Sequence, residues 1–186
     1  MKLQISTWTI QVFDQYGNLC VEELHNPNTL HLSGERYILS AAFATKLDGY
    51  GAAPPKLYIG LDARPVIMVR DALADAAGME PRAASYKRIS VSTDGEFSPV
   101  FEKPLEAVDV YGENQRKVFT LKASAVFEAI GEDFGTVKNC FLTTSPEGAT
   151  GALILSSPLL HSFDFWEGYK LSVEPTISLR AALINS

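Results

Sequence analysis

Residues 170–180 read KLSVEPTISLR, the most regular stretch in the chain. Its apolar positions all share one parity: Leu171, Val173, Pro175, Ile177 and Leu179. Such alternation is typical of a strand with one buried face, and it fixes the register, because a slip of one residue would bury every polar side chain. Pro175 has no N–H to offer a neighbouring strand, so we expect this strand to lie at a sheet edge or to hold a bulge there.

Working outward from this stretch, the second half of the chain contains further strands. Phe119–Phe127 (FTLKASAVF) alternates in the same way, with Val126 as the one exception. Thr136–Thr144 and Ala152–Ser156 are strands on either side of Ser145–Gly151, whose Pro and Gly residues predict a long hairpin loop.

The first half of the chain begins with two short strand patterns. Leu3–Phe13 and Leu19–Leu24 flank the turn residues Asp14–Asn18, which predicts an N-terminal hairpin over residues 3–24 that can act as a contact arm. Leu57–Leu61 is a short apolar strand, and Tyr86–Ser92 alternates like one. Two extended pieces follow, Ser98–Phe101 and Ala107–Tyr111, separated by Pro104.

Two segments have helical character. Ser33–Lys46 places apolar residues at spacings of three and four, and we expect Ser33 to cap its N-terminus. Arg70–Ala77 predicts a short helical turn that ends at Gly78. Many short strands with one α-helix (about 33–46) and one helical turn (about 70–77) indicate a mainly β fold, an antiparallel β-sandwich or jelly-roll-like domain spanning residues 1–186.

Composition excludes some classes of function. The chain has 16 Lys and Arg residues against 22 Asp and Glu, a net charge of −6, whereas a duplex-DNA binder needs a basic face. No apolar run reaches the roughly 20 residues that span a bilayer, and the first residues lack a signal-peptide pattern, so we expect a cytoplasmic protein or one released by lysis. Cys20 and Cys140 both lie in strand-like segments and are expected to be buried free thiols, with a single disulfide left open.

Catalytic and metal-binding motifs find little support. Asp62 follows an apolar strand, where enzymes often keep a catalytic acid, but no second carboxylate or histidine at a readable spacing supports it, so it is interpreted as a polar residue where the strand leaves the sheet. Glu132-Asp133 is interpreted as a solvated turn. His25, His31 and His161 lack metal-ligand spacing, and His161 is expected in a loop. We therefore expect no catalytic residue, no metal and no cofactor.

An aromatic cluster leaves one alternative open. The residues of Phe163–Trp166 are expected in a loop before the last strand. With Tyr169, Phe165 and Trp166 could form a platform on which a sugar stacks or to which a partner protein binds. The other interpretation is a loop folded over the end of the sandwich.

The order of these segments carries a resemblance over residues 8–180. The succession comprises Trp8, Gly17-Asn18, His25-Asn26, Asn28, Gly34-Glu35-Arg36, Leu57–Leu61, Ala72–Asp75, Glu80-Pro81, Ser85–Arg88, Val126-Phe127, Phe134–Asn139, Gly151–Ser156 and Gly168–Val173. It resembles structural proteins of tailed-phage virions, small β-sandwich proteins that decorate capsids or sit on tails.

The resemblance implies a function without catalytic residues. The expected role is a capsid decoration or cement protein that binds and stabilises the capsid lattice, with a tail, baseplate or fibre-associated structural protein as the alternative. The implied partners are the major capsid protein or other virion proteins and further copies of the chain, with neither nucleic acid nor membrane among them. The implied location is the virion, assembled in the host cytoplasm, and the loop Asp48–Pro55 is a second candidate contact arm.

Overall fold

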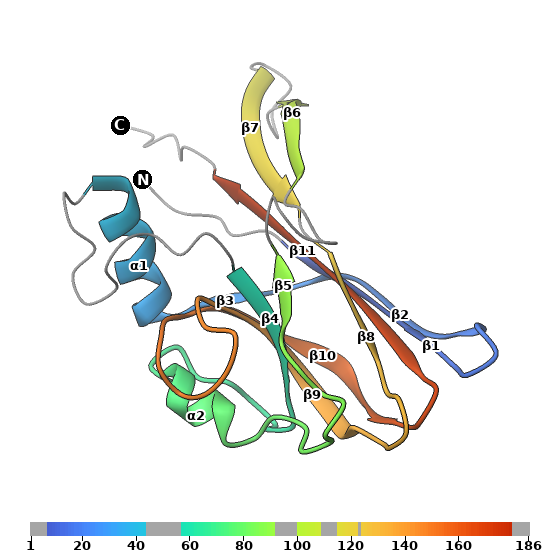
Figure 1. Ribbon diagram of the computed structural model, residues 1–186. Coiled ribbons are helices and arrows are strands. Elements are labelled where there is room, and N and C mark those ends of the chain that lie inside the picture. The colour runs from blue at the N-terminus through green and yellow to red at the C-terminus, as the bar shows by residue number, and fades with distance from the viewer. Residues whose placement is uncertain (1–6, 44–56, 92–99, 109–114, 123, 180–186) are drawn as a thin grey trace.

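The structure is a computed structural model that describes residues 7–43, 57–91, 100–108, 115–122 and 124–179 (Figure 1). Within them the chain forms two antiparallel sheets, as the alternating segments predicted. The first contains β1 (Trp8–Phe13), β2 (Leu19–Asn26), β6 (Val100–Val108), β7 (Gln115–Lys122), β8 (Ala125–Glu128) and β11 (Lys170–Leu179). The second contains β3 (Thr29–Leu30), β4 (Leu57–Asp62), β5 (Ile89–Val91), β9 (Gly135–Thr143) and β10 (Leu153–Phe165). Their orders are β2-β1-β11-β7-β6, with β8 also paired to β11, and β3-β10-β9-β4-β5.

Strand β11, the stretch KLSVEPTISLR, lies inside its sheet and not at an edge. It pairs with β1 on one side and with β8 and β7 on the other. Pro175 pairs with Trp8 of β1. On the other side of β11, Val173 pairs with Ala125 and Thr176 with Lys122, and the stretch between β7 and β8 includes residue 123, which lies outside the described residues. The expectation of an edge strand was therefore wrong, because β11 has hydrogen-bonded neighbours on both sides.

The segment predicted as one strand, Phe119–Phe127, is divided between β7 and β8. Both strands pair with β11 in the same register, so β8 continues the direction of β7 along the same side of β11. Ala125 and Phe127 are buried while Val126 is exposed, as the alternation predicted. A second difference concerns Pro104, which was expected to split a strand. It lies inside the continuous strand β6, where a register shift between Glu102 and Leu105 accommodates it.

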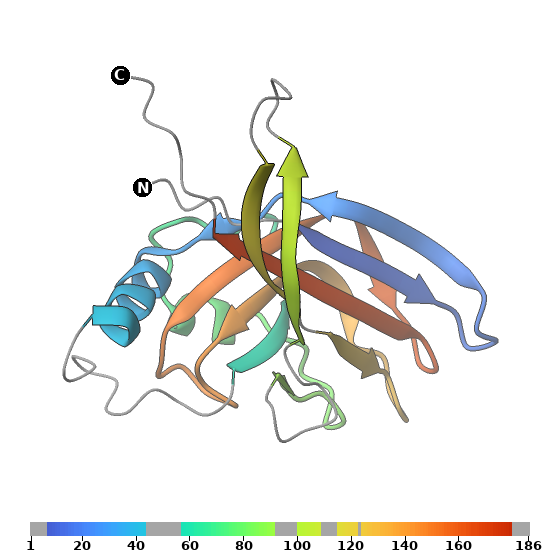
Figure 2. The ribbon, with the colours of Figure 1, turned by 90° about the horizontal axis from the view of Figure 1, so that it is seen from above.

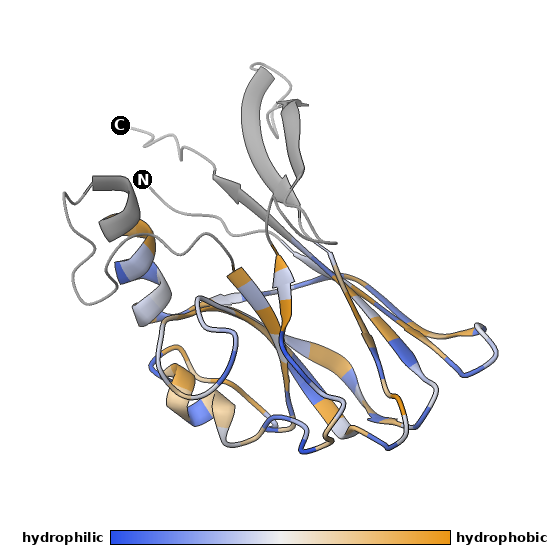
Figure 3. Ribbon diagram, viewed as in Figure 1, coloured by the Kyte–Doolittle hydropathy of each residue, from blue (hydrophilic) through white to orange (hydrophobic). Residues whose placement is uncertain are grey.

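The core lies between the two sheets. Trp8, Ile10 and Val12 point into it from β1, with the period of two of a strand that has one buried face. Further core side chains come from both sheets: Ile59, Leu61, Ala125, Phe127, Val137, Leu142, Ile154, Leu155, Leu171 and Val173. Figure 3 shows orange, apolar bands along the coloured strands of the two sheets.

The outer face of the second sheet has its own cover. Phe141 and Leu153 point away from the main core and pack against Ile67, Leu73 and Ala76, from α2 (Leu73–Ala77) and the segment before it. The predicted helical turn is therefore confirmed but shorter than expected.

Helix α1 (Leu32–Phe43) packs closely against β10. A Cβ on Gly34 would lie 2.4 Å from the carbonyl oxygen of Ile154, so only glycine permits this approach. The helix begins one residue earlier than expected, and Ser33 is not its cap: its hydroxyl donates to the carbonyl of Leu153 at 2.7 Å. Residues 44–46 of the predicted helix, and the loop Asp48–Pro55, lie outside the described residues.

The two sheets also meet along their edges. Buried Glu23 of β2 accepts the backbone N–H groups of Leu160 and His161 of β10, each at 2.9 Å. At the other side of the sandwich β5 lies against β8. The β1–β2 hairpin, confirmed with its five-residue loop, extends sideways beyond the rest of the chain (Figure 2).

Candidate functional site

Asp62, the acid at the end of β4, is fully buried and bound to the chain's own groups. Its carboxylate accepts the backbone N–H of Arg64 at 2.6 Å and the Nε–H of the same residue at 3.0 Å. The Arg64 guanidinium also forms an ion pair with Asp71 at 2.9 Å. The backbone carbonyl of Arg64 accepts a hydrogen bond from the side-chain amide of Asn139. Burial raises the pKa of Asp62, and the N–H and guanidinium of Arg64 act against that rise. The network fixes the chain where it leaves the sheet.

A second polar network joins the segment 80–88 to the distant loop between β9 and β10. Arg88, with a side chain 2% exposed, forms a bidentate pair with Glu80, at 2.9 Å from Nε and 2.8 Å from the terminal nitrogen. The Tyr86 hydroxyl donates to the same carboxylate at 2.7 Å. Arg88 also donates to the carbonyls of Ser145 and Gly148 at 3.0 and 2.8 Å. This arginine therefore anchors the β9–β10 loop to the segment before β5.

Two surface depressions flank the residues that carry this network. One, of about 340 Å³, is lined by Lys87, Glu147 and the network itself. The other, of about 560 Å³, is lined by Glu132 and Asp133, and both share Glu80, Pro81 and Arg82. Because charges of both signs border each depression and the buried charges at its base are already paired, neither indicates one class of small ligand.

The pair Glu132-Asp133 lies in the exposed turn between β8 and β9, where it was expected. Glu132 accepts the backbone N–H of Ala84, and Asp133 accepts that of Glu167 at 2.6 Å. The two carboxylates thus hold separate loops and do not face each other as an acid and base pair would.

The three histidines have separate surroundings. His31 is fully buried, its Nε2 lies 2.8 Å from the Ser156 hydroxyl, and burial lowers its pKa. His25 has a φ of 61° and contacts the hydroxyl of Thr7 at 3.4 Å. His161 lies exposed in β10, so its expected loop was wrong. Among the residues that the structure describes, no group of three or more His, Cys, Asp and Glu side chains could hold a metal ion.

Both cysteines are free, which removes the disulfide alternative. Cys140 is buried in β9, as expected, and burial raises its thiol pKa. Cys20 is exposed in β2, contrary to expectation, because the hairpin that carries it extends beyond the core.

The aromatic cluster does not form the platform considered above. Residues 163–165 belong to β10 and not to a loop. Phe165 is fully buried and stacks on Phe134 with ring centroids 5.1 Å apart, so only Trp166, 51% exposed, is available at the surface beside a partly buried Tyr169.

A group of exposed apolar side chains lies on α1 and on the segment 66–69 that contacts its first residue, and we call it the α1 patch. It consists of Leu32, Leu39, Val66, Met68 and Val69, which are between 48% and 61% exposed. The backbone N–H of Leu32 donates to the carbonyl of Val69 at 3.2 Å, so the helix and the 66–69 segment touch. The seven-residue spacing places Leu39 on the same side of the helix as Leu32.

The α1 patch was not predicted, although the sequence holds a signal for it. Residues 66–69 read VIMV, an apolar run between a strand and a helix, and only Ile67 of the four is buried. Contiguous exposed apolar side chains of this kind mark contact surfaces more often than single ones do.

Comparisons of the sequence with protein-family models and with curated proteins found no relative. Across the described ranges, no helix has both the length and the hydropathy to cross a membrane.

Proposed function

We propose that this chain is a structural protein of a tailed-phage virion, in the first place a capsid decoration or cement protein that stabilises the capsid lattice. A tail, baseplate or fibre-associated position is the alternative within the same class. The order of strands and turns that resembles such proteins supports the proposal, and so does the two-sheet architecture.

The observation that carries the proposal is the α1 patch. Burying apolar surface contributes about 25 cal/mol per Å² removed from water, and five neighbouring side chains offer a contact of the kind that protein interfaces use. Two of these side chains stand on α1, which Gly34 holds against β10. The patch is therefore presented on a packed element, and little ordering would be needed when a neighbouring virion protein covers it.

The buried charges support a binding role in another way. Arg88 with Glu80, and Arg64 with Asp62, each satisfy one another and connect segments of the chain. Ion pairs used in this way strengthen a scaffold, which suits a protein whose work is mechanical.

The test is the amount of this protein in purified virions of the phage that encodes it. Quantitative mass spectrometry should find hundreds of copies per particle if it decorates the capsid. Six or twelve copies would move it to the tail or baseplate, and absence from the particle would refute the proposal.

A pair of matched variants tests the contact itself. Met68→Asp places a charge in the α1 patch. Met79→Asp makes the same substitution at another exposed methionine, which lies outside the patch. Added to particles that lack the protein, the first variant should fail to bind and the second should bind like the wild type. Equal binding of both would remove the α1 patch from the contact.

A further inference from the structure

A second surface lies where the β8–β9 and β10–β11 turns meet, and we call it the acidic loop end (residues 128–134 and 164–169). Backbone hydrogen bonds hold the two turns together. Ala129 donates to the carbonyl of Tyr169 at 3.1 Å, Gly168 donates to that of Ala129 at 2.8 Å, and Phe134 donates to that of Phe165 at 2.9 Å. The two turns therefore behave as one unit, not as independent loops.

Two large apolar side chains are exposed on this unit. Ile130 is 65% exposed and Trp166 is 51% exposed. The residue before Trp166 is Phe165, whose fully buried ring is fixed in the core, so the backbone that presents the tryptophan is anchored. An exposed tryptophan on an anchored backbone is the usual form of an interface hot spot, because it loses little conformational entropy on binding.

The same two segments are rich in carboxylates. The acidic loop end carries Glu128, Glu132, Asp133, Asp164 and Glu167. Neither of its two segments contains a lysine or an arginine. Lys170, which lies 3.4 Å from Glu128, and Arg82, which lines the depression beside Glu132, offset only part of this charge.

We propose that the acidic loop end is a docking surface for a partner protein whose own surface carries Lys and Arg side chains around an apolar recess that receives Trp166. Complementary charge would steer the encounter and set the orientation, while the tryptophan would supply most of the contact energy. A second copy of this chain is a poorer occupant, because a symmetric contact would bring like charges together.

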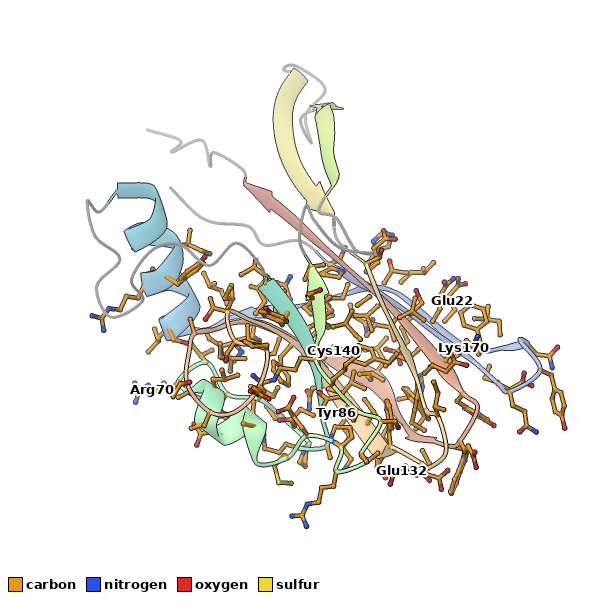
Figure 4. All side chains as sticks on the ribbon, viewed as in Figure 1. Glu22, Arg70, Tyr86, Glu132, Cys140 and Lys170 are labelled. Carbon is orange, nitrogen blue, oxygen red and sulfur yellow. The ribbon has the colours of Figure 1, made fainter. Side chains whose placement is uncertain are left out.

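This inference rests on the proposed function in one respect: in a virion the basic partner would be a neighbouring structural protein. The acidic loop end and the α1 patch lie at separate places on the molecule, as the labelled side chains of Glu132 and Arg70, the neighbour of Val69, show (Figure 4). A protein that bridges two neighbours needs two such surfaces, and their different chemistry would let each one select a different neighbour.

The test uses the whole chain and a yeast-displayed library of random peptides as the probe. We expect the enriched peptides to combine Lys or Arg with an aromatic or long aliphatic residue. Binding of a selected peptide should weaken about 30-fold for Trp166→Ala and should also weaken for Glu167→Lys and at raised salt. The matched control is Tyr16→Ala, which removes another exposed aromatic ring, at the tip of the β1–β2 hairpin, and should leave binding unchanged.

Several results would overturn the inference. Enrichment of peptides without basic residues, no enrichment at all, or binding that survives Trp166→Ala would each do so. A dimer in sedimentation equilibrium that Trp166→Ala dissociates would make a second copy the occupant and overturn the basic partner. If basic peptides bind as expected but the protein is absent from virions, the proposed function fails and the docking surface stands. If the protein is abundant in virions but shows no preference for basic peptides, the docking surface fails and the proposed function stands.

Discussion

Replacing Glu80 with alanine removes the only carboxylate that pairs with the buried Arg88 guanidinium in the described chain. The side chain of Arg88 is 2% exposed and that of Glu80 is 13% exposed, so this ion pair is largely shielded from water. The substitution also takes away the acceptor of the Tyr86 hydroxyl. It therefore tests directly whether this network supports the fold.

The size of the effect follows from what remains. Breaking one partner of a buried ion pair costs about 3–5 kcal/mol, because the other charge is left without its counter-ion. Arg88 keeps the carbonyls of Ser145 and Gly148, and water can enter from the adjacent depression, so we expect the lower end, about 3 kcal/mol. For a chain of this length that corresponds to a fall in Tm of about 6–12 °C.

Urea unfolding followed by tryptophan fluorescence measures this loss, because Trp8 is fully buried and reports on the core. Glu147→Ala is the matched control. This exposed glutamate lines the same depression, and its side chain forms no hydrogen bond with the described residues, so the free energy of unfolding should change by less than about 0.5 kcal/mol. In an Arg88→Met background the Glu80→Ala cost should largely disappear. A Glu80→Ala protein as stable as the Glu147→Ala protein would refute a structural role for the pair.

Three further predictions concern packing, protonation and thiol reactivity. Gly34→Ala should lower stability in urea unfolding despite the roughly 1 kcal/mol gain in helix propensity, because the new Cβ would meet a carbonyl of β10, whereas Gly78→Ala, with open space around it, should be neutral. Burial lowers the pKa of His31, so only the unfolded chain takes up its proton as the pH falls below the ordinary value of 6.5; unfolding free energy should drop there, and His31→Gln should flatten that slope. A thiol reagent should modify exposed Cys20 in the native protein and buried Cys140 only after unfolding, and equal rates would contradict the assigned burial.

The strands were predictable where a single chemical pattern decides them. In β1 and β11 the period of two is uninterrupted, and Trp8, Leu171 and Val173 are buried as their parity requires. Position within the sheet was not predictable in the same way. Pro175 indicated an edge because its missing N–H is a local property, whereas the strands that pair with β11 on its two sides come from distant parts of the sequence.

The length of β10 shows another limit. Residues 157–165 include a proline, a histidine and several polar groups, and they looked like a loop. They stay extended because β9 pairs with them on one side, while Glu23 accepts two of their N–H groups at the irregular part between Pro158 and Phe163. Glu23 is more than 130 positions away in the sequence, and nothing in the local pattern distinguishes it from its exposed neighbour Glu22.

The distribution of polar and apolar groups argues for the kind of site this protein uses. A catalytic site needs a titratable group with a shifted pKa that a substrate can reach. Here the pKa is raised for the Asp62 carboxyl, which is enclosed by Arg64, and for the Cys140 thiol, which lies inside the core. It is also raised for the Tyr86 hydroxyl, which borders a depression but is held between the Glu80 carboxylate and the N–H of Leu61. Several large apolar side chains are left exposed on the α1 patch and at the acidic loop end. Because burying such groups favours contact with another surface, these two surfaces support the proposed role of a protein held between neighbours.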